Sequence, residues 1–230
     1  MAVVYDTVRY VVSILILFVR YYLYWYWTRI YSKSSKVMIS DTRDAIFQSD
    51  PFAYQTHEWQ DSELVLFLES QPNKVINRCT YNSGWVRSCY GEEALKKIGH
   101  NPVSCSGVSM GSRNGILVYT MTVARHIDPQ YRLIGSSVPK ETENQGSCIS
   151  KGMDQGIHNW LLHSGILHRM LNDKITVFEQ GEGPVNTLGG LFGENKLIKL
   201  NMLDVGIFKK SGKLITIHNW NGKPSLSSSS

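Results

Sequence analysis

The sequence predicts an α/β domain, because apolar runs of strand length occur beside stretches with apolar residues at helical spacing. Residues 37–40, 64–69 and 174–180 are short apolar runs typical of strands, and residues 113–127 and 153–163 are typical of helices. The chain has 230 residues, of which 42% are hydrophobic and 19% charged. This composition predicts a folded core, in one domain or a domain with an appendage.

Charge and cysteine content restrict the classes of partner. The net charge of +5 is spread without a block of like charges, so we expect no nucleic-acid partner. The cysteines Cys79, Cys89, Cys105 and Cys148 match no zinc-site spacing. They could form disulfides in an oxidising compartment, with Cys79–Cys89 or Cys105–Cys148 as possible pairs, or remain free buried thiols.

Residues 10–27 form the most apolar segment, which Arg20 interrupts. Its length is at the lower limit for a membrane-spanning helix, since about 20 residues are needed. Two interpretations stay open. The segment is a membrane anchor, or it is a helix that packs on the sheet. The side chains that suit the packed helix are Arg20, Tyr21, Tyr22, Tyr24 and Trp25.

Residues 36–52, KVMISDTRDAIFQSDPF, carry the first cluster of polar residues. The apolar start predicts a buried parallel strand, and Asp41, Arg43 and Asp44 follow at its carboxyl end. In open α/β sheets, ligands bind at that edge. Pro51 lies in a turn that we expect to pack back onto the sheet. The alternative is a salt bridge between Arg43 and Asp44 that only frames a loop.

The next part of the chain predicts a strand, a turn and a short helix. Residues 64–69 are a second strand-length apolar run. Residues 82–85, Asn-Ser-Gly-Trp, are typical of a turn, and residues 92–98 predict a short helix that ends at Gly99.

Residues 102–112, PVSCSGVSMGS, predict a second site segment. Its small residues allow close approach of backbone to a ligand, and Ser112 suits the N-cap of the helix that follows through about Ile127. A tight strand-to-helix turn without a ligand is the alternative. The small residues are Ser104, Ser106, Gly107 and Gly111.

A predicted helix over residues 153–163 carries the third group of polar residues. Asp154 and Gln155 begin it, and Asp154 could serve only as a favourable partner of the helix dipole. His158 and His163 are better explained as surface or structural residues than as ligands. The apolar side of the helix is Ile157, Trp160 and Leu161. The loop before it, residues 135–152, is predicted to be a disordered segment or a lid.

The remaining residues predict strands and a tail. Residues 174–180 form a strand followed by a glycine-rich turn, and residues 205–208 and 213–218 form a predicted hairpin. Residues 225–230 are a serine-rich tail without a fold.

The segments VMISDTRD and DPF, CSGVSMGS and DQGIHN, in this order, resemble the nucleotide-diphospho-sugar glycosyltransferases of the GT-A type. The resemblance implies a Rossmann-like mixed sheet flanked by helices, with Asp154 and Gln155 as catalytic residues. The donor-binding residues that it implies are Asp41, Arg43, Asp44, Ser106, Gly107 and Asn159. The chain departs from the family at Arg43, where D-x-D has its second carboxylate, and at Cys105, where the family has Asn.

The resemblance also implies a divalent cation, Mn²⁺ or Mg²⁺, held by Asp41 and by His218. His218 begins a loose match, one residue out of register, to the family's H-x-x-G-x-K-P closure. Alternatively, Arg43 neutralises the diphosphate itself. The expected partners are a nucleotide sugar donor, a glycan or protein acceptor and a membrane, in the Golgi of the secretory pathway.

The predicted organisation is an apolar helix over residues 1–31, a glycosyltransferase-like domain over residues 32–224 and the tail. Only about 35 residues precede the acidic motif, so the fold is expected to be incomplete in its nucleotide-binding half. One alternative function is therefore a non-catalytic carbohydrate-binding or interaction protein. A third class, phosphotransferases of the haloacid dehalogenase type, requires Asp in place of Arg43. The hypothesis predicts that Asp41, Ser106 and Asp154 surround one cleft.

Overall fold

A computed structural model gives the structure of the protein. It describes residues 19–41, 50–53, 59, 61–69, 74–127, 152–179, 183–187 and 216–218.

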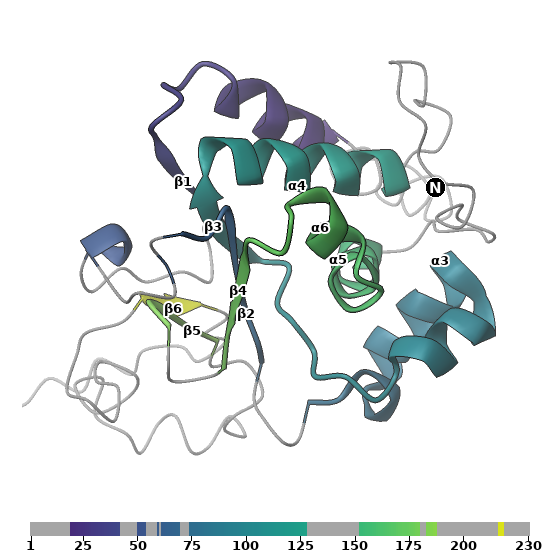
Figure 1. The fold of residues 1–230 in the computed structure, drawn as a ribbon. Coiled ribbons are helices and arrows are strands. Elements are labelled where there is room, and N and C mark those ends of the chain that lie inside the picture. Colours follow the sequence, from purple (N-terminus) through teal and green to yellow (C-terminus); the bar gives the residue numbers. More distant parts are fainter. Residues whose placement is uncertain are drawn as a thin grey trace, which may run out of the picture.

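A four-stranded mixed sheet with flanking helices forms the centre of the molecule (Figure 1). Its order is β1 (Lys36–Ser40), β3 (Val108–Ser112), β2 (Leu64–Phe67) and β4 (Ile175–Phe178). Strand β3 is antiparallel to both neighbours, whereas β2 and β4 are parallel. Strands β1, β2 and β4 therefore run in the same direction, and the predicted α/β class with a mixed sheet is confirmed.

The prediction of a buried parallel strand was wrong for β1. It pairs only with the antiparallel β3 among the described strands, at an edge of the sheet, and Val37 to Ser40 are only partly buried. A short apolar run predicts a strand but not its neighbour, because tertiary packing decides the position in the sheet.

The central strand β2 is buried on both faces. Leu64 and Leu66 belong to one core cluster, while Val65 and Phe67 belong to another. This separation follows from the two-residue period of a strand, which points successive side chains to opposite faces. The sheet therefore divides the interior into two cores.

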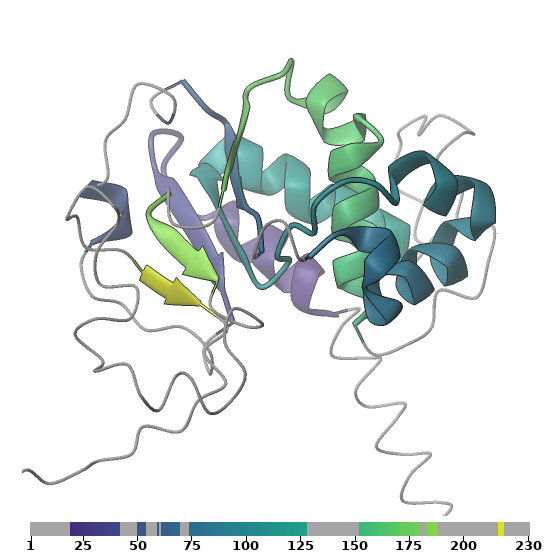
Figure 2. The ribbon, with the colours of Figure 1, turned by 90° about the horizontal axis from the view of Figure 1, so that it is seen from below.

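The helices cover one face of the sheet, where the larger core lies (Figures 1 and 2). The helical elements are residues 19–28, α3 (Thr80–Ile98), α4 (Arg113–Ile127), α5 (Met153–His163) and α6 (Ile166–Met170). The other face carries a smaller core against the two-stranded parallel sheet of β5 (Val185–Thr187) and β6 (Thr216–His218). Two short 3₁₀ helices, η1 (Pro51–Ala53) and η2 (Ile76–Arg78), complete the described elements.

The helix over residues 19–28 packs against the larger core beside the sheet. This agrees with the interpretation of the segment as a helix that packs on the sheet. Tyr21 is buried in the larger core, and Tyr22 and Tyr24 pack against it. Within the described ranges, no helix has the length and apolar character needed to cross a membrane. Residues 1–18 lie outside the described residues.

The turn predicted at residues 82–85 is wrong, because these residues belong to α3. Asn82 and Ser83 are buried there, and the Ser83 hydroxyl donates to the carbonyl of Thr80 (3.2 Å). The predicted helix over residues 92–98 is the second part of α3, beyond a break at Gly91 (φ 85°), and it ends at Gly99 as expected. Packing against α5 outweighs the weak helix propensity of the first part.

The helix predicted after Ser112 is confirmed as α4. The backbone N–H of Gly115 donates to the Ser112 hydroxyl oxygen (3.0 Å), which is the bond that an N-cap makes. Helix α5 and strand β4 also lie where the sequence predicts them. The loop before residue 152, the strand at 205–208 and the tail lie outside the described residues.

Neither of the two cysteine pairs that the sequence offered forms a disulfide. Cys79 and Cys105 are not disulfide-bonded, which agrees with the alternative of reduced thiols, whereas Cys89 is disulfide-bonded. Cys105 is buried in the smaller core, and this burial raises the pKa of its thiol. Spacing in the sequence cannot choose a pair because the fold determines which side chains meet.

Candidate functional site

Polar side chains gather where β1 and β2 end and β3 begins. Asp41 follows β1, Glu69 lies just beyond β2, and Ser106 precedes β3. The backbone N–H of Asp41 donates to the carbonyl of Gly107 (2.9 Å), which links the end of β1 to the loop before β3. This is the carboxyl edge of the three strands that run in one direction, where the sequence predicted a ligand site.

Arg20 joins two carboxylates that lie far apart in the sequence. Its Nη1 lies 3.5 Å from Asp41 Oδ1, and its Nη2 is hydrogen-bonded to Asp154 Oδ2. The Asp41 side chain is 41% exposed, whereas that of Asp154 is 7% exposed. The cluster thus extends from the surface to the interior, and Arg20 supplies its positive charge.

The protonation of Arg20 reflects opposing influences. Burial alone would lower the pKa of its guanidinium, but Tyr21, Asp154 and Asp41 outweigh this effect and raise the pKa. The guanidinium also lies over the Tyr21 ring, with 5.0 Å between Cζ and the ring centroid. Arg20 is therefore a permanent cation at this edge.

Ser106 completes the group that the sequence predicted to converge. Its hydroxyl donates to Asp154 Oδ2 (3.2 Å), the oxygen that Arg20 also contacts. The structure thus brings Asp41, Ser106 and Asp154 together around Arg20. Their roles in binding or catalysis stay predictions.

Gln155 and Asn159 hold the loop that carries Ser106. Gln155 Oε1 accepts from the Ser106 backbone N–H (2.7 Å), and its Nε2 donates to Ser104 O (2.9 Å) and Glu69 Oε1 (3.2 Å). Asn159 accepts from the Ser104 backbone N–H (2.8 Å) and donates to the Ser104 carbonyl (3.0 Å). These bonds fix the loop relative to α5, so each residue has a structural role whether or not it contacts a ligand.

His158 is a structural residue beneath the same loop, one of the two alternatives for this side chain. It is fully buried, and burial lowers the pKa of its imidazole from 6.5 to about 3. Ser104 Oγ donates to Phe67 O (3.3 Å), so His158 Nε2 donates to Ser104 Oγ (2.9 Å). Its Nδ1 then accepts from the Tyr119 hydroxyl (2.8 Å). With this assigned tautomer, His158 links Tyr119 to Ser104 in the loop that carries Ser106.

Of the two expected ligands of a divalent cation, Asp41 and His218, the structure describes the side chain of Asp41. The exposed carboxylate of Asp41 is an oxygen donor of the kind that Mg²⁺ and Mn²⁺ take. No group of three or more His, Cys, Asp or Glu side chains gathers among the described residues. Arg43, Asp44 and the side chain of His218 lie outside them. Asp41 therefore fits as one ligand.

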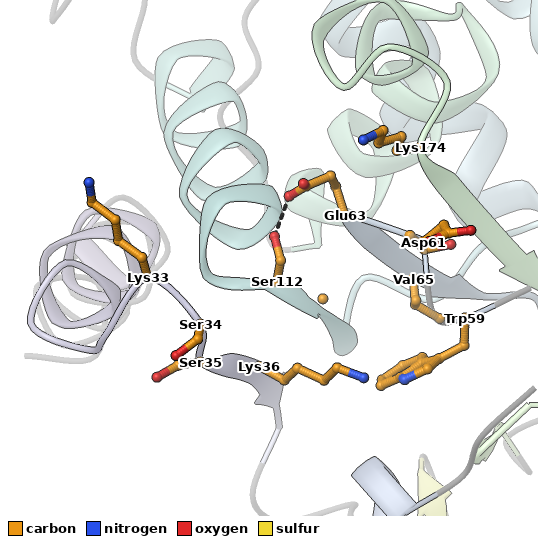
Figure 3. A pocket seen from close by; sticks show the side chains of 12 residues that line it. Lys33, Ser34, Ser35, Lys36, Trp59, Asp61, Glu63, Val65, Ser112 and Lys174 are labelled. Carbon is orange, nitrogen blue, oxygen red and sulfur yellow. Dashed lines mark hydrogen bonds between the residues drawn. The ribbon is translucent and has the colours of Figure 1, made fainter. Parts of the chain in front are cut away.

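A hollow of about 320 Å³ lies at the opposite ends of these strands from the polar cluster (Figure 3). Lys36 Nζ lies 4.8 Å from the centroid of the Trp59 ring, and Glu63 accepts a hydrogen bond from the Ser112 hydroxyl. Lys174 also lines the hollow. The sequence did not indicate this hollow, because the residues that line it come from separate segments without a shared motif.

From the sequence, Arg20 was expected in a packed helix but not in the site, and nothing in the sequence singled out Glu69. The available signal for Arg20 was a lone charge within an apolar run, because such a charge requires either a buried partner or contact with solvent.

Comparison of the chain with protein-family models, curated proteins and solved structures finds no match.

Proposed function

We propose that the protein is a glycosyltransferase of the GT-A type, which transfers a sugar from a nucleotide diphosphate to an acceptor hydroxyl. The observation that carries the proposal is Arg20 held between Asp41 and Asp154, with Ser106 beside them. The three sequence segments that resemble this family supply Asp41, Ser106 and Asp154. Their contact at one sheet edge supports a common site.

In this proposal, the exposed side of the cluster receives the diphosphate. Arg20 is a permanent cation there, and it would stabilise the negative charge that develops on the leaving nucleoside diphosphate. A Mg²⁺ or Mn²⁺ ion at Asp41, with Asp44 and His218 as further candidate ligands, would supply additional charge neutralisation when bound. Arg43 is a candidate for direct contact with the diphosphate.

Asp154 and Ser106 would orient hydroxyl groups of the donor or acceptor. Asp154 is the best candidate for a general base, because it is a carboxylate at the inner end of the cluster. Gln155 and Asn159 would keep the loop of Ser106 and Gly107 in the conformation that the donor contacts. The proposed site therefore depends on a preorganised loop.

The test is release of nucleoside diphosphate from a panel of UDP- and GDP-sugars, with and without Mn²⁺. We expect Asp41→Asn and Asp154→Asn to lower the rate on the order of 100-fold, since each removes a charge from the site. Asp173→Asn is the matched control, because Asp173 is an exposed residue at positive φ that Asn also adopts. If the wild type and Asp41→Asn release nucleoside diphosphate at the same background rate, glycosyltransferase activity is excluded.

A second candidate function is non-catalytic binding of a sugar nucleotide or glycan. It is favoured by Arg20, which already occupies both carboxylates of the cluster. Binding of a UDP-sugar measured by calorimetry, without turnover by the wild type, would support this candidate over the transferase.

A further inference from the structure

The exposed apolar side chains of the protein are concentrated on its first described helix. Eight large apolar side chains are exposed among the described residues, and six belong to residues 19–31. They recur at helical spacing and continue into the turn after the helix, so they form one stripe. This aromatic stripe consists of Val19, Leu23, Tyr26, Trp27, Ile30 and Tyr31.

The stripe lies on the side of the helix that faces away from the core. Tyr21 (2% exposed) and Thr28 (3%) point inward, whereas Tyr26 (60%) and Ile30 (75%) point outward. Figure 1 shows this helix at the margin of the molecule beside α4, with no labelled element beyond it. The exposed face therefore has no described protein partner, although its opposite face is packed.

The composition of the stripe suits a membrane surface. Trp and Tyr have an apolar ring and a polar tip, and they are enriched where lipid headgroups meet acyl chains. Helices that lie in this interface combine such residues with basic side chains. Here Arg29 lies within the same stretch of residues as the stripe and Lys33 follows directly after it, and both side chains are exposed.

The charge of the surrounding sequence favours an anionic partner. Residues 7–40 contain five basic residues and no Asp or Glu. A second copy of the chain, paired face to face, would bring the same basic residues together without an acidic partner from this stretch. Anionic lipids attract such basic segments. The strongly apolar residues 10–18 directly precede the stripe in the sequence.

We propose that the aromatic stripe docks on the surface of an anionic lipid bilayer, with Trp27 in the headgroup region. Arg29 and Lys33 contact lipid phosphates or carboxylates. The inner face of the same helix keeps Arg20 in the polar cluster, so docking leaves the contacts of Asp41 and Asp154 intact. This proposal does not depend on sugar transfer.

The first test uses the full chain and vesicles of phosphatidylcholine with roughly 30% phosphatidylserine, an anionic surface of the kind described above. Lipids brominated near the headgroup quench only tryptophans that reach the bilayer. We expect such quenching in the wild type, and we expect Trp27→Phe to reduce it by roughly half or more, since Trp27 is 49% exposed. Trp85→Phe is the control and should leave the quenching unchanged.

Unchanged quenching in Trp27→Phe would overturn the proposal, because another segment would then make the contact. Absence of quenching in the wild type would also overturn it.

The second test compares affinities for the same vesicles by co-sedimentation. Tyr26→Ser/Ile30→Ser/Tyr31→Ser removes three outward side chains and keeps every tryptophan. We expect its affinity to fall at least roughly tenfold, because it loses apolar area that the bilayer would bury. Tyr81→Ser/Met170→Ser removes the two large apolar side chains that are exposed elsewhere among the described residues, and it should bind as the wild type does.

Equal binding by both variants would overturn the proposal. Light scattering before lipid is added measures the oligomeric state of the wild type and of the stripe variant. A dimer that the stripe variant converts to a monomer would assign the stripe to a second copy of the chain and overturn membrane docking.

Discussion

Arg20 connects parts of the protein that the sequence keeps apart. An arginine within an apolar helix is costly unless its charge has a partner, and the same holds for the nearly buried carboxylate of Asp154. Their contact satisfies both groups, while the more exposed Asp41 shares the guanidinium from the surface side. The residue that interrupts the apolar segment therefore holds the N-terminal helix to α5.

Replacement of Arg20 should destabilise the protein. We expect Arg20→Met to lower the free energy of unfolding by about 3 kcal/mol, because it leaves the carboxylate of Asp154 buried without its cation. Urea unfolding monitored by circular dichroism measures the change. Arg87→Met, which breaks the exposed pair of Arg87 with Glu92, is the control and should leave stability close to that of the wild type.

The double variant Arg20→Met/Asp154→Asn separates charge from packing. It removes the unpaired charge, so we expect it to be more stable than Arg20→Met alone. If Arg20→Met unfolds at the same urea concentration as the wild type, the buried ion pair is not a source of stability.

At the level of elements, α3 and α5 make close contact at Gly156. A Cβ atom at this position would lie 2.7 Å from Trp85 Cβ and 3.1 Å from the backbone carbon of Trp85. The absence of a side chain at Gly156 thus allows the two helices to approach. The same contact explains why residues 82–85 are helical although their composition is typical of a turn.

The two helix glycines should respond in opposite directions to the same substitution. We expect Gly156→Ala to cost about 1–3 kcal/mol, because α3 would have to shift. Gly84→Ala should instead stabilise by about 0.5–1 kcal/mol, because nothing lies within 4 Å of its Cβ position and Ala favours a helix. Midpoints of urea unfolding compare the two. A Gly156→Ala protein as stable as the wild type would show that the helices can separate at little cost.

For the whole molecule, the two histidines of α5 make stability depend on pH, and of these His158 is fully buried and His163 is partly buried. Burial lowers the pKa of His158 from 6.5 to about 3, and it lowers the pKa of His163 to about 4. The unfolded chain therefore takes up these protons first as the pH falls. Their contribution to stability is complete above about pH 6.5 and is lost towards pH 4 and below.

His163→Gln tests this dependence. Gln keeps a donor for the carbonyl of Pro102, to which His163 Nε2 donates (2.8 Å), but it does not titrate. Between pH 7 and pH 5, the variant should lose about 2 kcal/mol less stability than the wild type. Urea unfolding at both pH values measures the difference. An equal loss of stability in His163→Gln and the wild type would contradict the expected linkage.

Much of the fold was predictable because local patterns carry it. Strands β1, β2 and β4, the N-cap at Ser112 and helices α4 and α5 lie where apolar periodicity and capping residues predict them. The antiparallel edge position of β1, the helix at residues 82–85 and the choice of which cysteines form a disulfide were not predictable. Each depends on contacts with segments that are remote in the sequence.

The sequence alone determined the chemistry of the candidate site: Asp41 after a strand, Ser106 in a loop of small residues and Asp154 at the start of a helix. Only the tertiary structure decided that Arg20 joins them and that Gln155 and Asn159 fasten the loop beneath them. It also decided that one face of the first helix stays exposed. The physical reason is that periodicity and capping act within a few residues, whereas ion pairs and close packing form between segments that meet only when the sheet and its helices assemble.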